Sequence, residues 1–182
     1  MGRAFKFHNP HGVYFISTSV INWISIFVRE KYFESLITNL DYCRKNKGME
    51  IYAYCIMPNH FHLIFRSREV PASSLIRDFK TYTSKQLFTM ISENKKESRK
   101  DWITRTFNFY GLINPSNKNH QFWQNANHPI ELWSYAMFEQ KRNYIHQNPV
   151  KAGFVNNPED WKYSSARNYG LDDDSILEID RT

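Results

Sequence analysis

The stretch Tyr52-Ala-Tyr-Cys-Ile-Met-Pro-Asn-His-Phe-His-Leu-Ile-Phe65 is apolar and aromatic except for a short interruption at its centre. Proline cannot donate to a sheet ladder and asparagine tolerates turn geometry, so Met57-Pro-Asn59 is expected to join two strands of a hairpin. In a strand, successive side chains point to opposite faces of the sheet. His60 and His62 therefore share one face of the second strand. The residues expected on the opposite face are all apolar: Phe61, Leu63 and Phe65.

The segments around this hairpin predict an alternation of strands and helices. The expected elements, in chain order, are a strand at 13–19, a helix at about 29–47, strands at 50–56 and 60–66, a helix at about 72–91, a short strand at 121–124, and a helix from about 132 or 134 to 147. The first six elements match the split β-α-β pattern of a ferredoxin-like sheet. We therefore expect an α+β fold, in which an antiparallel sheet has its first and third strands at the centre and helices on one face. The extra C-terminal helix is expected to carry Tyr144.

Local signals set the ends of these elements. The last helix is expected to stop before Pro149, because the residue before a proline disfavours helical geometry. Residues 93–100 are mostly charged and are expected to form a solvated linker or an exposed loop. Trp161 and Tyr163 are expected to pack back on the body of the protein, whereas the acidic tail at about 171–182 is expected to be loose.

The composition is typical of a folded protein with an acidic partner. At 182 residues, 41% hydrophobic and 16% aromatic, the chain is expected to form one domain over 1–182 with its core at about 13–169. Its net charge of +6 favours nucleic acid as the partner. The two cysteines, Cys43 and Cys55, are too few for a disulfide scaffold. No apolar run approaches the roughly 20 residues of a membrane span, and no signal segment is visible, so no membrane partner and a cytoplasmic location are expected.

The two histidines on one strand face are a candidate pair of metal ligands. Imidazole is a common ligand, and a core strand seldom places histidine at two neighbouring positions of one face. In the expected topology, His60 and His62 lie in the middle of the sheet, where ligands are held rigidly. The alternative is two half-exposed histidines on an edge strand, because histidine is only intermediate in its burial preference.

The last helix offers two further groups. Tyr144 and Asn148 are four residues apart and so lie on one helix face. An amide oxygen is a reasonable ligand for Mg²⁺ or Mn²⁺, and a metal held by His60, His62 and Asn148 would polarise a bound phosphate. Tyr144 could then attack as a covalent nucleophile, although a free tyrosine has a pKa of about 10 and needs a nearby base or cation. The alternative is that Tyr144 is an ordinary helix residue and Asn148 a helix stop before proline.

Four motifs in this order resemble the single-tyrosine HUH transposases, and most of all the REP-associated tyrosine transposases. The resemblance extends over about 13–169, most of the chain. The motifs that carry it are His60-Phe-His62 after Met-Pro-Asn, Phe122-Trp-Gln124, Tyr144-Ile-His-Gln-Asn-Pro-Val-Lys-Ala-Gly153, and Trp161-Lys-Tyr-Ser-Ser165.

The resemblance implies a ferredoxin-like fold and metal-dependent cleavage and joining of single-stranded DNA through a phosphotyrosine intermediate. His60 and His62 match the metal-binding histidines of the family, Asn148 its helix-borne ligand and Tyr144 its nucleophile. Mg²⁺ or Mn²⁺ is the implied cofactor, and single strands beside hairpins are the implied substrates. The sequence departs from the family after Gln124, where many members carry a basic run and this chain has Asn125-Ala-Asn-His-Pro129.

Basic and aromatic side chains elsewhere are candidate DNA contacts. Basic groups neutralise phosphates, and aromatic rings stack on unpaired bases. The candidates are Arg77, Lys80, Tyr82, Lys85 and Trp123. Tyr82 is also the alternative nucleophile, on a helix where Lys80 and Lys85 flank it. For the basic residues, the alternative is a solvated helix face.

Three other functions remain open at this point. One is a domesticated protein that binds DNA hairpins without cleaving them. Another is a metal-dependent nuclease that uses water in place of tyrosine. The third is a structural domain stabilised by zinc, which a chelator would unfold. The sequence also leaves open whether the protein acts as a monomer or a homodimer.

Overall fold

A computed structural model describes residues 6–114, 119–125 and 127–181. Within this part of the chain, four strands form one antiparallel sheet in the order β2-β3-β1-β4. The strands are β1 (Tyr14–Ser19), β2 (Met49–Ile56), β3 (His60–Ser67) and β4 (Ile130–Glu131). This order is that of a ferredoxin-like fold. The prediction that the first and third strands lie together at the centre is confirmed.

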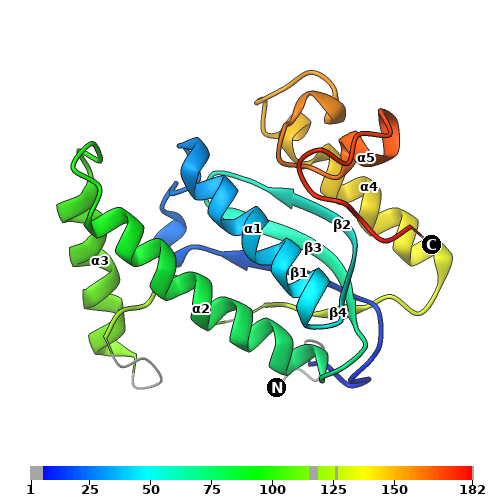
Figure 1. The fold of residues 1–182 in the computed structure, drawn as a ribbon, viewed down its shortest axis with the longest axis horizontal. Helices are drawn as coiled ribbons and strands as arrows, with labels where there is room; N and C mark the ends of the chain where they lie inside the picture. Colours follow the sequence, from blue (N-terminus) through cyan, green and yellow to red (C-terminus); the bar gives the residue numbers. More distant parts are fainter. Residues whose placement is uncertain (1–5, 115–118, 126, 182) are drawn as a thin grey trace.

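Helices cover both faces of the sheet. The helices are α1 (Glu30–Asn46), α2 (Ala72–Ser92), α3 (Lys100–Ile113), α4 (Tyr135–Lys151) and α5 (Ala166–Gly170), with 3₁₀ turns η1 (Ile21–Trp23) and η2 (Pro158–Asp160). Figure 1 shows α1 and α2 side by side across one face, with α3 beyond α2 at the opposite end of the molecule from α4. None of the described helices combines the length and the apolar character needed to cross a membrane.

Successive side chains of β3 point to opposite faces of the sheet, so neighbouring residues are buried in different layers. Phe61, Leu63 and Phe65 belong to the large core on the side of α1 and α2, as predicted. Ile64 faces the other way, into a smaller core that Phe138 and Ile145 of α4 also join. His60 and His62 share the face of Ile64 and therefore lie beneath α4.

The predicted fourth strand at 121–124 is wrong in its position. Only Trp123 of that segment makes a strand bridge, to Val20, while the regular β4 pairs with the beginning of β1. Both segments nevertheless follow the same side of β1, because the backbone of Gln124 donates to Ser19 at 2.8 Å and Ser17 donates to Asn127 at 3.1 Å. The pairing partners are about a hundred residues apart in the chain, so no local pattern fixes which residues pair.

The prediction that the last helix stops before Pro149 is wrong, because α4 continues to Lys151. Pro149 has no backbone N–H and so makes no helical hydrogen bond of its own, but the helix is extended past it by a hydrogen bond from the Ala152 backbone to the Asn148 carbonyl at 3.0 Å. At the other end, the Ser134 side chain accepts from the backbone of Met137 and caps the helix. Asn148 is therefore held in regular helix rather than in a frayed end.

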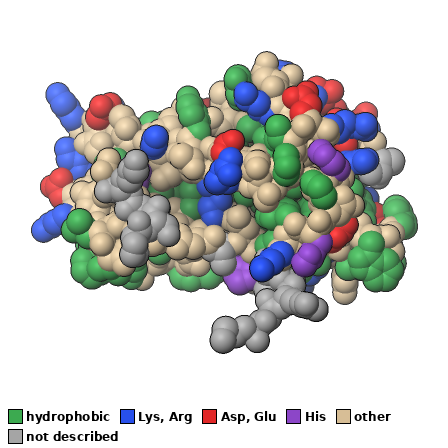
Figure 2. Space-filling view, turned by 90° about the horizontal axis from the view of Figure 1, so that it is seen from below, with side chains coloured by type: hydrophobic (Ala, Val, Ile, Leu, Met, Phe, Trp, Pro, Cys, Tyr) green, Lys and Arg blue, Asp and Glu red, His purple; other side chains and the backbone are tan. Residues whose placement is uncertain are grey.

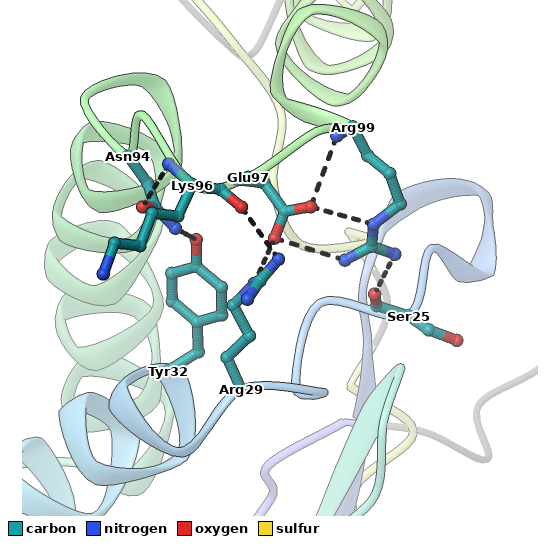
Figure 3. Close-up of polar contacts among 7 residues, drawn as sticks. All are labelled: Ser25, Arg29, Tyr32, Asn94, Lys96, Glu97 and Arg99. Atoms are coloured by element: carbon teal, nitrogen blue, oxygen red, sulfur yellow. Dashed lines mark hydrogen bonds and ion pairs between the residues drawn. The ribbon is translucent and has the colours of Figure 1, made fainter.

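The charged segment at 93–100 is a mostly exposed loop, as predicted, but Glu97 within it is buried. Glu97 is only 2% exposed, and its carboxylate forms ion pairs with Arg29 and Arg99, both at 3.0 Å. Burial alone would raise the pKa of Glu97, but the hydrogen bonds from Arg99 and Arg29 outweigh it and lower the pKa. Arg99 also donates to the carbonyl of Ser25 at 2.9 Å (Figure 3). The segment thus fastens the start of α3 to the loop before α1.

The C-terminal segment covers the outer edge of β2. Trp161 and Tyr163 pack back as predicted: the Trp161 indole donates to the Ile56 carbonyl, and the Ile56 backbone donates to Tyr163, both at 2.9 Å. Further along, the backbone of Asp180 donates to Ile51 at 2.7 Å and its carboxylate accepts from Ile51 at 2.8 Å.

The tail up to residue 181 is not loose, contrary to expectation. Leu177 and Ile179 are buried, at 3% and 6% exposure, and join the large core. These two apolar side chains anchor an otherwise acidic segment, and Thr182 lies outside the described residues. The predicted domain also begins outside them, since the description starts at residue 6.

Candidate active site

His60 and His62 lie side by side on the α4 face of β3. Their ring centroids are 4.8 Å apart, and the residues opposite them on β1 are Ser19 and Ser17. His62 is 3% exposed. The prediction of a mid-sheet pair is therefore confirmed in position, and the alternative of an exposed edge strand does not hold, because β3 is paired on both sides.

The side chain of Asn59 fixes the tautomer of His60. Its amide nitrogen donates to the Trp23 carbonyl at 3.4 Å, so the amide oxygen is the atom that faces His60 Nδ1 at 2.7 Å. With the proton on Nδ1, Nε2 is the ring nitrogen of His60 whose lone pair can bind a metal. Burial lowers the pKa of His60, so the ring is neutral at pH 7. Hydrogen bonds of this kind orient metal-binding histidines in proteins.

His62 is neutral and incompletely paired. Burial, with lesser contributions from His60 and Lys141, lowers its pKa to about 3. Its Nε2 lies 3.3 Å from the amide nitrogen of Asn148, while its Nδ1 is buried without a hydrogen-bond partner. Buried polar atoms without a partner are uncommon in folded proteins, and those that occur are often found where an ion or an ordered water binds.

These residues fit a divalent ion of the hard type. Among the described residues, no three His, Cys, Asp or Glu side chains come together as a ligand group, so the third ligand has to be of another type. Asn148 is near both histidines, and a half turn of its amide exchanges the nitrogen for an oxygen ligand. Cys55 lies opposite His62 on β2, but burial raises the pKa of its thiol and keeps it protonated.

Tyr144 reaches the histidines from α4. Its ring centroid is 5.3 Å from that of His62 and 5.9 Å from that of Phe15, and the residue is 42% exposed. Lys141, one turn earlier, places its ammonium 5.7 Å from the Tyr144 ring and 5.0 Å from the Phe15 ring. The structure thus brings together all four residues predicted for the site, His60, His62, Tyr144 and Asn148. It also places the Lys141 ammonium beside the Tyr144 ring.

A groove of about 530 Å³ lies between α2 and the segment that follows α3. Arg77 and Lys85 line it from α2, and His120 lines it from the facing segment. Lys80 also lines the groove, but its ammonium donates to the Gln124 carbonyl at 2.7 Å and to Asn127 Oδ1 at 2.5 Å. Burial lowers the pKa of Lys80 to about 8. Lys80 therefore holds the groove wall together. Lys85 and Arg77 are the basic groups at the groove surface, and Arg77 forms an exposed ion pair with its neighbour Asp78 at 2.9 Å.

The two aromatic candidates lie in contrasting places. Trp123 is 4% exposed and donates its indole N–H to Thr83 at 3.0 Å, which leaves little ring surface for a base. Tyr82 is 61% exposed on α2. Because α2 packs on the face opposite the histidines, the sheet separates Tyr82 from the candidate metal ligands.

The positive charge is not gathered in one patch on the face seen in Figure 2. Lys and Arg side chains are dispersed across it, with Asp and Glu side chains between them. The net charge of +6 therefore gives no outline of a DNA footprint on this face.

Three residues of this region had no functional assignment from the sequence. Asn59 was interpreted only as a turn residue, although its place directly before His60 was a signal. Lys141 precedes Tyr144 by three residues, the spacing of one helix turn, and could have been found on that basis. Trp23 gave no signal at all, because a loop residue is brought to His60 only by the fold.

Comparisons with known proteins match this chain to transposases. The family model described as "Transposase IS200 like" matches residues 20–110. A Haemophilus influenzae protein named as a REP-associated tyrosine transposase is 30% identical over 126 residues, which are 64% of this chain and 58% of that protein. This chain therefore spans little more than half of that relative's length.

A solved structure matches along the whole chain. It is described as the REP-associated tyrosine transposase bound to a REP hairpin. It aligns with a TM-score of 0.65 over 100% of both chains, at 20% identity. At this identity the likeness is one of fold.

Proposed function

Because this chain belongs to the IS200-like transposase family, we propose that it cleaves and rejoins single-stranded DNA through a covalent phosphotyrosine intermediate. Tyr144 is the nucleophile of this proposal. His60, His62 and Asn148 would hold Mg²⁺ or Mn²⁺. The proposed place of action is the cytoplasm.

The observation that carries the proposal is the convergence of two distant segments on one face of the sheet. His62 comes from the central strand β3, whereas Tyr144 and Asn148 come from α4, more than eighty residues later. His62 Nε2 is nevertheless 3.3 Å from the Asn148 amide, and its ring is 5.3 Å from that of Tyr144. The four-residue spacing on α4 presents nucleophile and ligand together.

The residues divide the chemistry between them. A bound divalent ion would offset negative charge on the phosphate in the transition state. The Tyr144 oxygen bonds to phosphorus as the bond to the 3′-oxygen breaks, which leaves a 5′-phosphotyrosine and a free 3′-hydroxyl. The Lys141 ammonium, 5.7 Å from the centre of the Tyr144 ring, would help to offset negative charge on the phosphate under attack. Attack by a 3′-hydroxyl on the phosphotyrosine reverses the step and joins strands.

Single-stranded DNA beside a hairpin is the proposed substrate. The related structure is described as bound to a REP hairpin, which supports this choice. The groove on α2 offers Arg77 and Lys85 to a phosphate backbone. Since one chain supplies both Tyr144 and the histidines, a monomer can assemble the site. A homodimer is compatible with it but is not required.

The test is a denaturing gel that detects a covalent adduct between protein and DNA. The wild type is mixed with Mn²⁺ or Mg²⁺ and labelled hairpin oligonucleotides whose single-stranded flank is randomised. We expect an adduct that Tyr144→Phe and His62→Ala both abolish, while Tyr82→Phe, the matched control, retains it. An adduct that persists in Tyr144→Phe but not in Tyr82→Phe would make Tyr82 the nucleophile. Cleavage without an adduct would show that the protein is a nuclease that uses water. Hairpin binding without cleavage would show that it is a domesticated binding protein.

A further inference from the structure

Trp23 stands beside one of the candidate metal ligands with most of its ring in solvent. The indole is 57% exposed, and its ring centroid lies 5.8 Å from that of His60 at an interplanar angle of 68°. In such an edge-to-face contact the imidazole does not cover both faces of the indole. The ring is thus open to a flat ligand next to the metal-binding face.

The backbone of Trp23 lies in the left-handed region. Its φ is 53°, and that of Asn22 before it is 54°. Asparagine adopts this conformation with some frequency, but a bulky aromatic residue rarely does so, because the side chain crowds the backbone. Strain of this kind is found mostly at functional sites, where the surrounding structure enforces it.

Hydrogen bonds on each side hold the loop in this conformation. The backbone of Ile21 donates to Phe122 at 2.7 Å, and that of Val20 donates to Asn59 at 2.9 Å. The Asn59 side chain, which orients His60, also donates to the Trp23 carbonyl. Beyond the loop, Arg99 donates to the Ser25 carbonyl (Figure 3). The indole is therefore presented by a fixed loop rather than by a flexible one.

The other exposed tryptophans do not combine exposure with a left-handed backbone and a contact with a candidate metal ligand. Trp102 and Trp133 are 50% and 80% exposed, but neither has a positive φ, and the structure records no ring contact between them and the histidines. Among the described residues, Trp23 alone joins exposure, a left-handed backbone and contact with a candidate ligand.

We propose that Trp23 is a stacking platform for one unpaired base of the DNA, next to the phosphate that is cleaved. The inference rests on the proposed function and deepens it, because it assigns a binding site to a nucleobase. Every base has a flat π-face, so an indole holds an unpaired base with little demand on sequence. A phosphate at His60 brings the base of a flanking nucleotide within reach of the ring. By holding that base, Trp23 positions the phosphate for Tyr144.

The test measures the coupling between Trp23 and single bases of the DNA. Proteins carrying Tyr144→Phe, which bind without forming an adduct, select oligonucleotides from hairpins with a randomised flank in the presence of Mg²⁺. Each base of the selected flank is then replaced in turn by an abasic site, and Kd is measured with Trp23 and with Trp23→Ala. We expect one position where loss of the base weakens binding about tenfold or more with Trp23 and hardly at all with Trp23→Ala. Equal losses in both proteins at every position would overturn the inference.

Controls separate this role from a structural one. Tyr42→Ala removes an aromatic ring of similar exposure, 53%, from the opposite layer of the fold and should leave Kd unchanged. Trp23→Phe should restore part of the coupling. Trp23→Gly accepts the positive φ without strain, so it should melt no lower than the wild type while losing the coupling. A large fall in melting temperature, with binding reduced equally at all flank positions, would assign Trp23 to the fold instead.

The binding test of Trp23 gives a result whether or not the wild-type protein cleaves DNA. Wild-type cleavage without base coupling at Trp23 rejects this inference alone. Coupling at Trp23 on oligonucleotides with which the wild type, carrying Tyr144, forms no adduct supports the stacking platform and rejects the proposed chemistry. Failure to select any oligonucleotide rejects both.

Discussion

The protein contains two buried polar clusters that are opposite in character. Glu97 is surrounded by donors from Arg29 and Arg99, and all its acceptor capacity is used within the chain. His62 is equally buried, but one of its ring nitrogens has no partner, and its neighbours His60 and Asn148 also have atoms available. The first cluster is complete without a ligand, and the second is not.

The difference teaches how to separate polar groups that support the fold from those that serve chemistry. In a closed cluster, internal hydrogen bonds offset the cost of removing the charges from water. Breaking such a cluster therefore lowers the free energy of unfolding. An open cluster of neutral groups leaves a buried polar atom unpaired, which lowers the stability of the fold, and keeps other side-chain atoms available to a ligand. Changes in the two clusters should therefore affect different measurements.

The largest expected effect is that of His62→Gln in the open cluster. Removing a ligand should lower the rate of adduct formation by about a thousandfold, since a metal ion supplies several kcal/mol to the transition state. The melting temperature should move by less than about 4 °C, which corresponds to about 1 kcal/mol for a chain of this size. Rate assays measure adduct formation, and differential scanning calorimetry measures the melting temperature. A collapse of stability with chelator, as in a zinc-stabilised domain, would contradict the division into open and closed clusters.

Glu97→Gln breaks the closed cluster and should show the reverse pattern. We expect a loss of about 2 kcal/mol in the free energy of unfolding, below the range for fully buried pairs because both arginines are partly exposed. The folded-state pKa of Glu97 is lowered, so its stabilisation is complete above the ordinary glutamate pKa and is lost as the pH falls through the folded value. Urea titrations at neutral and acidic pH should therefore find the two proteins converging in acid. Adduct formation at a permissive temperature should be unchanged.

Asn59→Ala tests the hydrogen bond that orients His60 in the open cluster. Without the amide, His60 is free to change its tautomer, and the apparent affinity for Mn²⁺ should fall by about 10- to 100-fold. Titration with Mn²⁺, followed by electron paramagnetic resonance, measures the change. Asn157→Ala, which removes an exposed asparagine from a distant turn, is the control and should leave metal affinity intact. An unchanged affinity in Asn59→Ala would mean that the tautomer is fixed by something else.

The smallest effect is expected at Thr18, whose hydroxyl is also buried without a partner. Thr18 pairs with Phe61 and points into the apolar core, away from the histidines. Thr18→Val keeps the shape and removes the unpaired hydroxyl, so it should leave stability unchanged or raise it by up to about 1 kcal/mol. Adduct formation should be unaffected. A loss of activity here would show that an unpaired atom marks function even outside the cluster.

The sequence predicted those parts of the site that depend on a local period. His60 and His62 share a face because a strand alternates, and Tyr144 and Asn148 share a face because a helix repeats nearly every four residues. The order of strands and helices was enough to place the histidine strand at the sheet centre. The opposite layer was predicted as well, since Phe61, Leu63 and Phe65 are apolar throughout.

The sequence failed where the environment of a residue comes from far along the chain. Glu97 looked solvated because Arg29, which neutralises it, lies 68 residues earlier. The strand predicted at 121–124 was misplaced because β1 pairs instead with residues 130–131. Trp123 was assigned to DNA on its aromatic character, whereas the structure uses it to fill the core. In each case the neighbours that decide the environment lie far along the chain and are brought close only by the fold.

The covering of β2 by the C-terminal segment limits how two copies of this protein could join. Sheets often merge edge to edge, and an open strand invites that contact. Here the Ile51 and Ile56 backbones are already bonded to the segment that contains Trp161, Tyr163 and Asp180. A second copy could pair with β2 only after this segment had left, which would expose Leu177 and Ile179 to water at a cost of about 3–6 kcal/mol. On this side the sheet cannot grow, so any shared sheet would have to form at the opposite edge.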